Sequence, residues 1–65
     1  MENVYAELKR RAQYARNSRS LALLYETNGM KKMARELGAI TKAQAMELNE
    51  IIVRNGINNP QAYDR

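Results

Sequence analysis

The sequence contains no cysteine, histidine or tryptophan, and these absences exclude several kinds of chemistry. Without cysteine or histidine the chain cannot form a zinc finger, a thiol nucleophile, a Ser-His-Asp triad or an imidazole general base. No disulfide can stabilise the fold, and the lack of cysteine fits a reducing compartment, the cytoplasm by default. The three glycines stand apart from one another, so no glycine-rich phosphate loop is expected.

Long apolar runs are also absent. The longest, Leu21 to Tyr25, is far shorter than the roughly 20 residues that cross a bilayer, and no signal peptide is recognisable. We therefore expect a cytoplasmic protein without membrane contact.

The carboxylates are too scattered to predict catalysis. Glu47 and Glu50 would share a helix face, where paired carboxylates can hold a hard cation or transfer protons. The spacing of Glu50 and Arg54 favours a solvated face with an ion pair instead. A core this small also cannot readily enclose a dry pocket. The sequence predicts no enzyme, no cofactor, no metal and no small-molecule substrate.

What is present indicates an all-α fold. Alanine occurs nine times, proline only at Pro60, and apolar and polar residues nowhere alternate over a sustained stretch. A chain of 65 residues holds one small domain, here assigned to residues 1–57 with a polar tail over 58–65. Its twelve Leu, Ile and Val residues make a thin core. The chain is thus a tight helical mini-domain, an oligomer, or a protein that orders on a partner.

Three helices are predicted, over residues 4–16, 19–37 and 42–55, and together they would form a small three-helix bundle. Asn3 is a suitable N-cap for the first helix. The apolar phase changes at residues 17–20, which favours a boundary there, although a helix continuing through this stretch stays open. Gly29 would bend the second helix, as an alternative to ending it. The apolar faces contain Val4, Tyr5, Leu8, Ala12 and Ala15 in the first helix, and Leu21, Leu24 and Tyr25 followed by Met30, Met33, Ala34 and Leu37 in the second.

The boundary between the second and third helices carries the clearest signals. Gly38 is expected as the left-handed residue after the second helix, and Thr41 with Gln44 has capping-box spacing. Ile40 and Ala45 could form a hydrophobic staple. The third helix would bury Ala45, Leu48, Ile51 and Ile52 and end at Asn55-Gly56, with Ile57 folding back on Ile52. In the tail, Asn59-Pro60 could begin a short turn that lets Tyr63 dock.

Positive charge is concentrated in one part of the chain. Residues 8–35 carry eight Lys and Arg against the single acid Glu26, a local balance of +7 within a total of +4. Such cations either keep the protein soluble or bind nucleic acid or an acidic protein surface. The candidate binding residues are Lys9, Arg10, Arg16, Arg19, Lys31, Lys32 and Arg35, with Tyr14 beside them for stacking on a base.

The stretch from Met33 to Ala39 resembles the first helix and turn of the phage-repressor type of helix-turn-helix. Ala34 and Gly38 match the small residue and the turn glycine of that family. The family next requires apolar residues six and nine positions after the glycine, where this chain has Gln44 and Glu47. The chain is therefore not assigned to it.

An apolar flank of the third helix offers a different function. Met46 and Val53 fall at the edge of its apolar stripe or outside it, so they could contact a second copy or another protein. Alternatively, the stripe is wide and the tail covers it. The primary hypothesis is thus a non-catalytic accessory protein that binds nucleic acid or an acidic protein through its basic surface. The alternative is a self-associating or partner-binding adaptor or inhibitor that uses the third helix.

Overall fold

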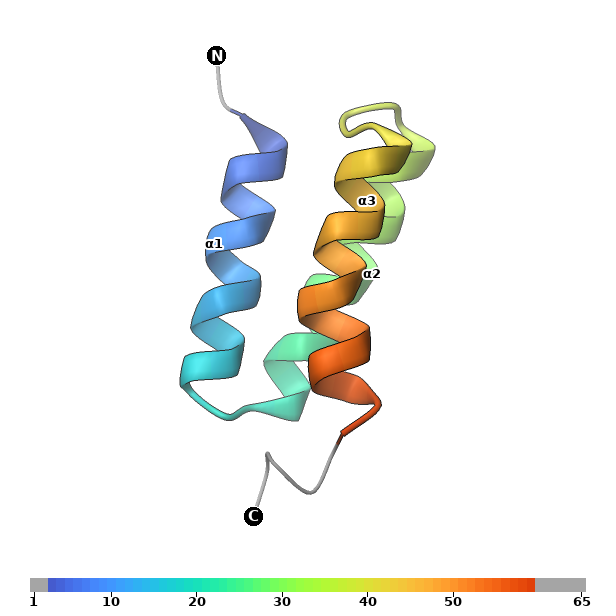
Figure 1. The fold of residues 1–65 in the computed structure, drawn as a ribbon. Helices are drawn as coiled ribbons and strands as arrows, with labels where there is room; N and C mark the ends of the chain where they lie inside the picture. Colours follow the sequence, from blue (N-terminus) through green and yellow to red (C-terminus); the bar gives the residue numbers. More distant parts are fainter. Residues whose placement is uncertain (1–2, 60–65) are drawn as a thin grey trace.

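The computed structural model describes residues 3–59 and confirms the all-α three-helix bundle. The elements are α1 (Val4–Asn17), α2 (Leu21–Glu36), α3 (Lys42–Asn49) and the π-helix η1 (Glu50–Ile57). η1 continues α3, so the two form one rod that lies beside α1 and α2 (Figure 1). No helix in the described range is long and apolar enough to cross a membrane. The tail positions Pro60 and Tyr63, for which a docking turn was predicted, lie outside the described residues.

Both ends of α1 are closed by local hydrogen bonds. Asn3 caps the first turn, as predicted, by accepting from the amide of Ala6 at 3.1 Å. At the other end the amide of Ser20 donates to the carbonyl of Ala15 and that of Arg19 to Arg16, both at 3.1 Å. This is a Schellman end in which Arg19, at φ 54°, occupies the left-handed position usually given to glycine. The helix therefore breaks at residues 17–20 and does not continue through them.

The boundary between α2 and α3 has the predicted chemistry. Gly38 adopts φ +76°, and the amide of Ala39 donates to the carbonyl of Ala34 at 2.8 Å. The side chains of Thr41 and Gln44 each accept from the other residue's backbone amide, which completes the capping box. α2 runs uninterrupted through Gly29, so this glycine does not end a helix.

The predicted end of the third helix is wrong. Gly56 does not adopt a positive φ and lies buried inside η1, which continues to Ile57. The turn here is wider than an α-helical turn, since the amide of Asn58 donates five residues back to Val53 at 2.8 Å. A Cβ at Gly56 would lie 2.9 Å from Cδ1 of Leu24. The glycine is therefore used for close packing of η1 on α2 rather than for ending a helix.

The core lies between the three rods and is built from few large side chains. Leu24, Leu48 and Ile52 are fully buried, and alanines fill much of the rest of the helix contacts. The buried apolar residues are Leu8, Ala12, Ala15, Leu24, Ala34, Ile40, Leu48 and Ile52. The predicted apolar face in the second half of the second helix is not buried. Met30, Met33 and Leu37 on this face are exposed.

Candidate protein-binding groove

Lys31 does not belong to an exposed basic surface, contrary to the sequence-based prediction. Its side chain is buried, with 9 % of the residue exposed, and its Nζ donates to Oδ1 of Asn49 on α3 at 2.6 Å. Burial lowers the pKa of the Lys31 ammonium, and the neighbouring Lys32 lowers it further. The aliphatic stem fits between α2 and α3 and only the amine needs a polar partner, which explains how a lysine enters this interior.

Two other candidate cations are engaged by carboxylates of the chain. Nζ of Lys9 lies 3.7 Å from Glu47 on α3 and 5.8 Å from the centre of the Tyr5 ring. The Tyr5 hydroxyl donates to the same Glu47, and this bond raises the pKa of the phenol. Nη2 of Arg10 donates to both carboxylate oxygens of Glu7, at 2.6 and 2.7 Å. These residues connect α1 to α3 or stabilise α1 itself, and are less free to bind a partner.

Four candidate cations are exposed and have no carboxylate partner within residues 3–59. They are Arg16, Arg19, Lys32 and Arg35. Together with Lys9 and Lys31 they do not form one stripe. Arg16 follows Lys9 by two helical turns and shares its side of α1, whereas Arg35 follows Lys31 by one turn on α2.

The third rod separates these two groups of cations. Lys9 contacts Glu47, and Lys31 contacts Asn49. Residues two positions apart on an α-helix point about 160° away from each other, so Glu47 and Asn49 lie on opposite flanks of α3. Lys9 of α1 and Lys31 of α2 therefore border different sides of the rod.

The flank predicted on the third helix is reduced to one exposed residue. Met46 is 62 % exposed, as expected for an interface residue without a partner. Val53, in contrast, is half-buried and packs against the core. Glu47 and Glu50 do not act as a pair either, because Glu50 binds Arg54 at 3.1 Å while Glu47 binds Tyr5 and Lys9.

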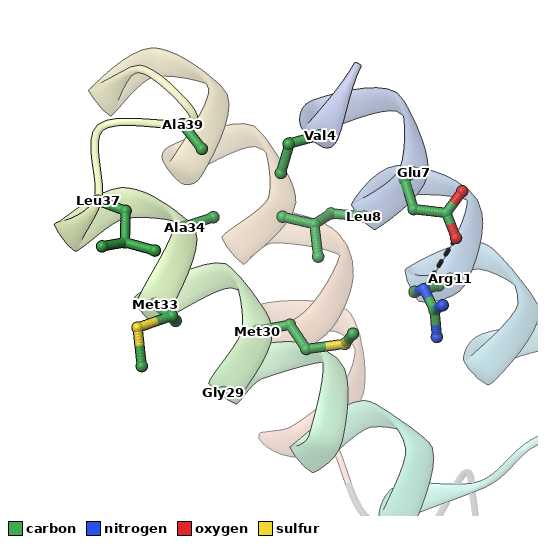
Figure 2. Close-up of a pocket in the computed structure, with 10 residues that line it drawn as sticks. All are labelled: Val4, Glu7, Leu8, Arg11, Gly29, Met30, Met33, Ala34, Leu37 and Ala39. Atoms are coloured by element: carbon green, nitrogen blue, oxygen red, sulfur yellow. Dashed lines mark hydrogen bonds and ion pairs between the residues drawn. The ribbon is translucent and has the colours of Figure 1, made fainter. Parts of the chain in front are cut away.

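A larger apolar surface lies between α1 and α2. It is a groove of about 560 Å³, here called the α1–α2 groove. The α1 side supplies Val4, Glu7, Leu8 and Arg11, and the chain from α2 into the following loop supplies Gly29, Met30, Met33, Ala34, Leu37 and Ala39 (Figure 2). Met33 is 57 % exposed and Leu37 is 75 % exposed. Adjacent exposed apolar side chains of this size are typical of a contact surface rather than of scattered surface positions.

The groove lies on the face of the α1–α2 pair that is turned away from the third rod. Lys9 and Lys31 both reach α3, whereas Arg11 and Met33, each two residues further along, line the groove. Residues two positions apart again point about 160° away from each other around each helix axis. α3 and η1 thus cover one side of the pair, and the other side is left open.

The charged residues of the groove are paired at its edge. Glu7 accepts from Arg10 and from Nε of Arg11, the latter at 2.9 Å. These guanidinium groups, Arg10 first, lower the pKa of the Glu7 carboxyl. No cluster of three or more possible metal ligands occurs in the range 3–59. The arrangement therefore offers apolar contact with a positively charged edge.

The sequence predicts Met30, Met33 and Leu37 on an apolar face of the second helix, and the structure leaves this face exposed. Their spacing correctly indicated one apolar face on α2, but periodicity does not say whether another element of the chain covers that face. No protein-family model, curated protein sequence or solved structure matches this chain.

Proposed function

We propose that this protein is a non-catalytic binding protein that acts by occupying a surface of another protein, with the α1–α2 groove as its contact site. The observation that carries the proposal is the exposure of Met33 and Leu37 beside Val4 and Met30 in a single hollow of about 560 Å³. Leaving such side chains in water forgoes burial free energy that a partner would recover.

A photo-crosslinking amino acid placed in the groove tests this directly. It would replace Met33 in one variant and Met46, an equally exposed methionine outside the groove, in a matched control. In cells of the native host, we expect discrete heavier adducts from position 33 and none of the same size from position 46. The measurement is immunoblotting of the tagged chain, followed by mass spectrometry of the adducts.

Equal labelling from both positions, or no adduct from position 33, would contradict the proposal. Circular dichroism of each variant separates loss of binding from loss of the fold. The predicted interface around Met46 and Val53 would be favoured if the control position alone gave adducts.

The four exposed cations without carboxylate partners among the described residues support a second candidate function, binding of nucleic acid. Phosphate contacts by Arg16, Arg19, Lys32 and Arg35 would release counterions, so affinity for a random duplex should fall steeply with salt. Replacing all four with Ala should abolish that binding. An affinity that does not depend on salt concentration, or no binding at low salt, would contradict this second candidate function. The groove is the better supported site, because three of the seven predicted cations, Lys9, Arg10 and Lys31, are engaged within the fold.

The expected compartment is the cytoplasm, on the sequence grounds given above. Fluorescence of a tagged full chain would test it.

A further inference from the structure

We infer that the α1–α2 groove binds an amphipathic helix of another protein, with apolar residues on one face and acidic residues beside them. This inference rests on the proposed function and specifies its partner.

The shape of the groove fits a helix. Its walls are the contacting helices α1 and α2 (Figure 2), and α3 with η1 packs against both of them on their other side. Met30, Met33 and Leu37 follow one another at spacings of three and four residues, a stretch of about 10 Å along α2. A helix with apolar residues at i, i+3 or i+4, and i+7 presents the same repeat over two turns.

The charge at the groove favours an acidic partner over a second copy. Arg10 and Arg11 share the single carboxylate of Glu7, so this edge retains a positive excess. The whole chain carries +4. Two copies would bring like charges together, whereas carboxylates flanking an apolar face complement the groove.

The lining also indicates what kind of recognition to expect. Met30 and Met33 have unbranched, flexible side chains that adapt to differently shaped apolar groups. Recognition would then depend on the pattern of apolar and acidic residues more than on one particular sequence.

A displayed library of random peptides of about 16 residues, long enough to form a helix on binding, tests the inference. The library is selected on the intact wild-type chain, and the enriched peptides are then measured against each variant. We expect enriched peptides with the two-turn apolar repeat and flanking Asp or Glu, and at least about tenfold weaker binding to Met33→Glu. Met46→Glu, matched in residue type and exposure, should bind them like the wild type.

A charge reversal provides the second arm. Arg11→Glu should weaken the acidic peptides and improve binding of the same peptides with Lys at the flanking positions. Enrichment of basic or non-helical peptides, no enrichment, or equal binding by Met33→Glu would overturn the inference. So would sedimentation of the wild type as a dimer that Met33→Glu dissociates, because the occupant would then be a second copy. Crosslinks from position 33 to another protein, together with enrichment of basic or non-helical peptides or no enrichment, would refute the acidic helix while retaining the proposed function.

Discussion

At the scale of single residues, Lys31 places a charged side chain in the interior at a cost in free energy. The residue is 9 % exposed, and its ammonium donates to Oδ1 of Asn49 at 2.6 Å. Desolvation of a charge costs free energy that a single hydrogen bond does not fully offset. The lowered pKa of Lys31 expresses this cost, since the folded state binds the proton less tightly than the unfolded chain does.

We predict that Lys31→Met raises the free energy of unfolding at pH 7 by about 1 kcal/mol, because it removes the buried charge and keeps the stem. Asn49 is exposed, so its amide can bind water instead. As pH rises from the lowered pKa toward 10.5, the folded wild type loses the proton first and gains stability, so the advantage of the variant should shrink. Urea unfolding of the wild type and the variant at pH 7 and pH 10 measures the stability gain and its decrease with pH. The control Lys32→Met removes only the repulsion from an exposed neighbour, so it should raise the free energy of unfolding less, and a less stable Lys31→Met would contradict this account.

Arg19 is a second residue whose local conformation is costly. A left-handed backbone disfavours any residue with a Cβ by roughly 1–2 kcal/mol, and the exposed Arg19 side chain makes no ion pair within residues 3–59. We predict that Arg19→Gly stabilises the fold by about 0.5–1 kcal/mol, the remainder being offset by the greater freedom of glycine in the unfolded chain. Gly38→Ala, at the corresponding position after α2, should destabilise it by about 1 kcal/mol. Thermal unfolding compares the two, and a destabilised Arg19→Gly would show that the arginine side chain matters there.

At the scale of elements, local chemistry decided what the sequence could predict. Asn3, Gly38 and the pair Thr41 and Gln44 act within a few residues of themselves, so their roles could be inferred from spacing alone. The helix break was placed correctly, but the left-handed residue there is an arginine, which sequence rules do not favour. The π-helix was missed because residue spacing does not predict a π-turn, and the role of Gly56 is seen only in its close approach to Leu24 of another element.

Substitutions at two glycines test the close packing of Gly56 on Leu24. We predict that Gly56→Ala destabilises the protein by about 1 kcal/mol or more, because the new methyl group would crowd Cδ1 of the buried Leu24 and approach the carbonyl of Ile51 at 3.3 Å. Gly29→Ala is the control, since nothing lies within 4 Å of its Cβ position inside α2. It should stabilise the fold by about 0.5–1 kcal/mol. Chemical unfolding of both variants should give shifts of opposite sign; shifts of the same sign would refute the close packing.

At the scale of the whole molecule, the candidate site could be predicted only in part. The sequence indicated that apolar residues would remain for a partner, and it placed them on the third helix at Met46 and Val53. The structure places the larger apolar surface between α1 and α2 instead. The difference arises because Val53 finds core neighbours, whereas Met33 and Leu37 lie on the face that the third rod does not cover.

Because both walls of the groove come from helices that also build the core, an occupant would hold α1 and α2 together. We predict that a peptide selected for the groove raises the melting temperature of the wild type as its concentration increases, and leaves that of Met33→Glu unchanged. Differential scanning calorimetry over a peptide titration measures this. Binding without any rise in melting temperature would mean that the peptide also binds the unfolded chain.

The open face opposite α3 therefore has a consequence for the lifetime of the protein in a cell. A bundle with so thin a core opens more often when its groove is empty, and proteases act on the opened chain. Its abundance should then follow that of its partner, and surplus copies should be degraded without a dedicated regulator. An empty α1–α2 groove would then lead to degradation of the unbound copies, so the number of binding proteins would match the number of targets.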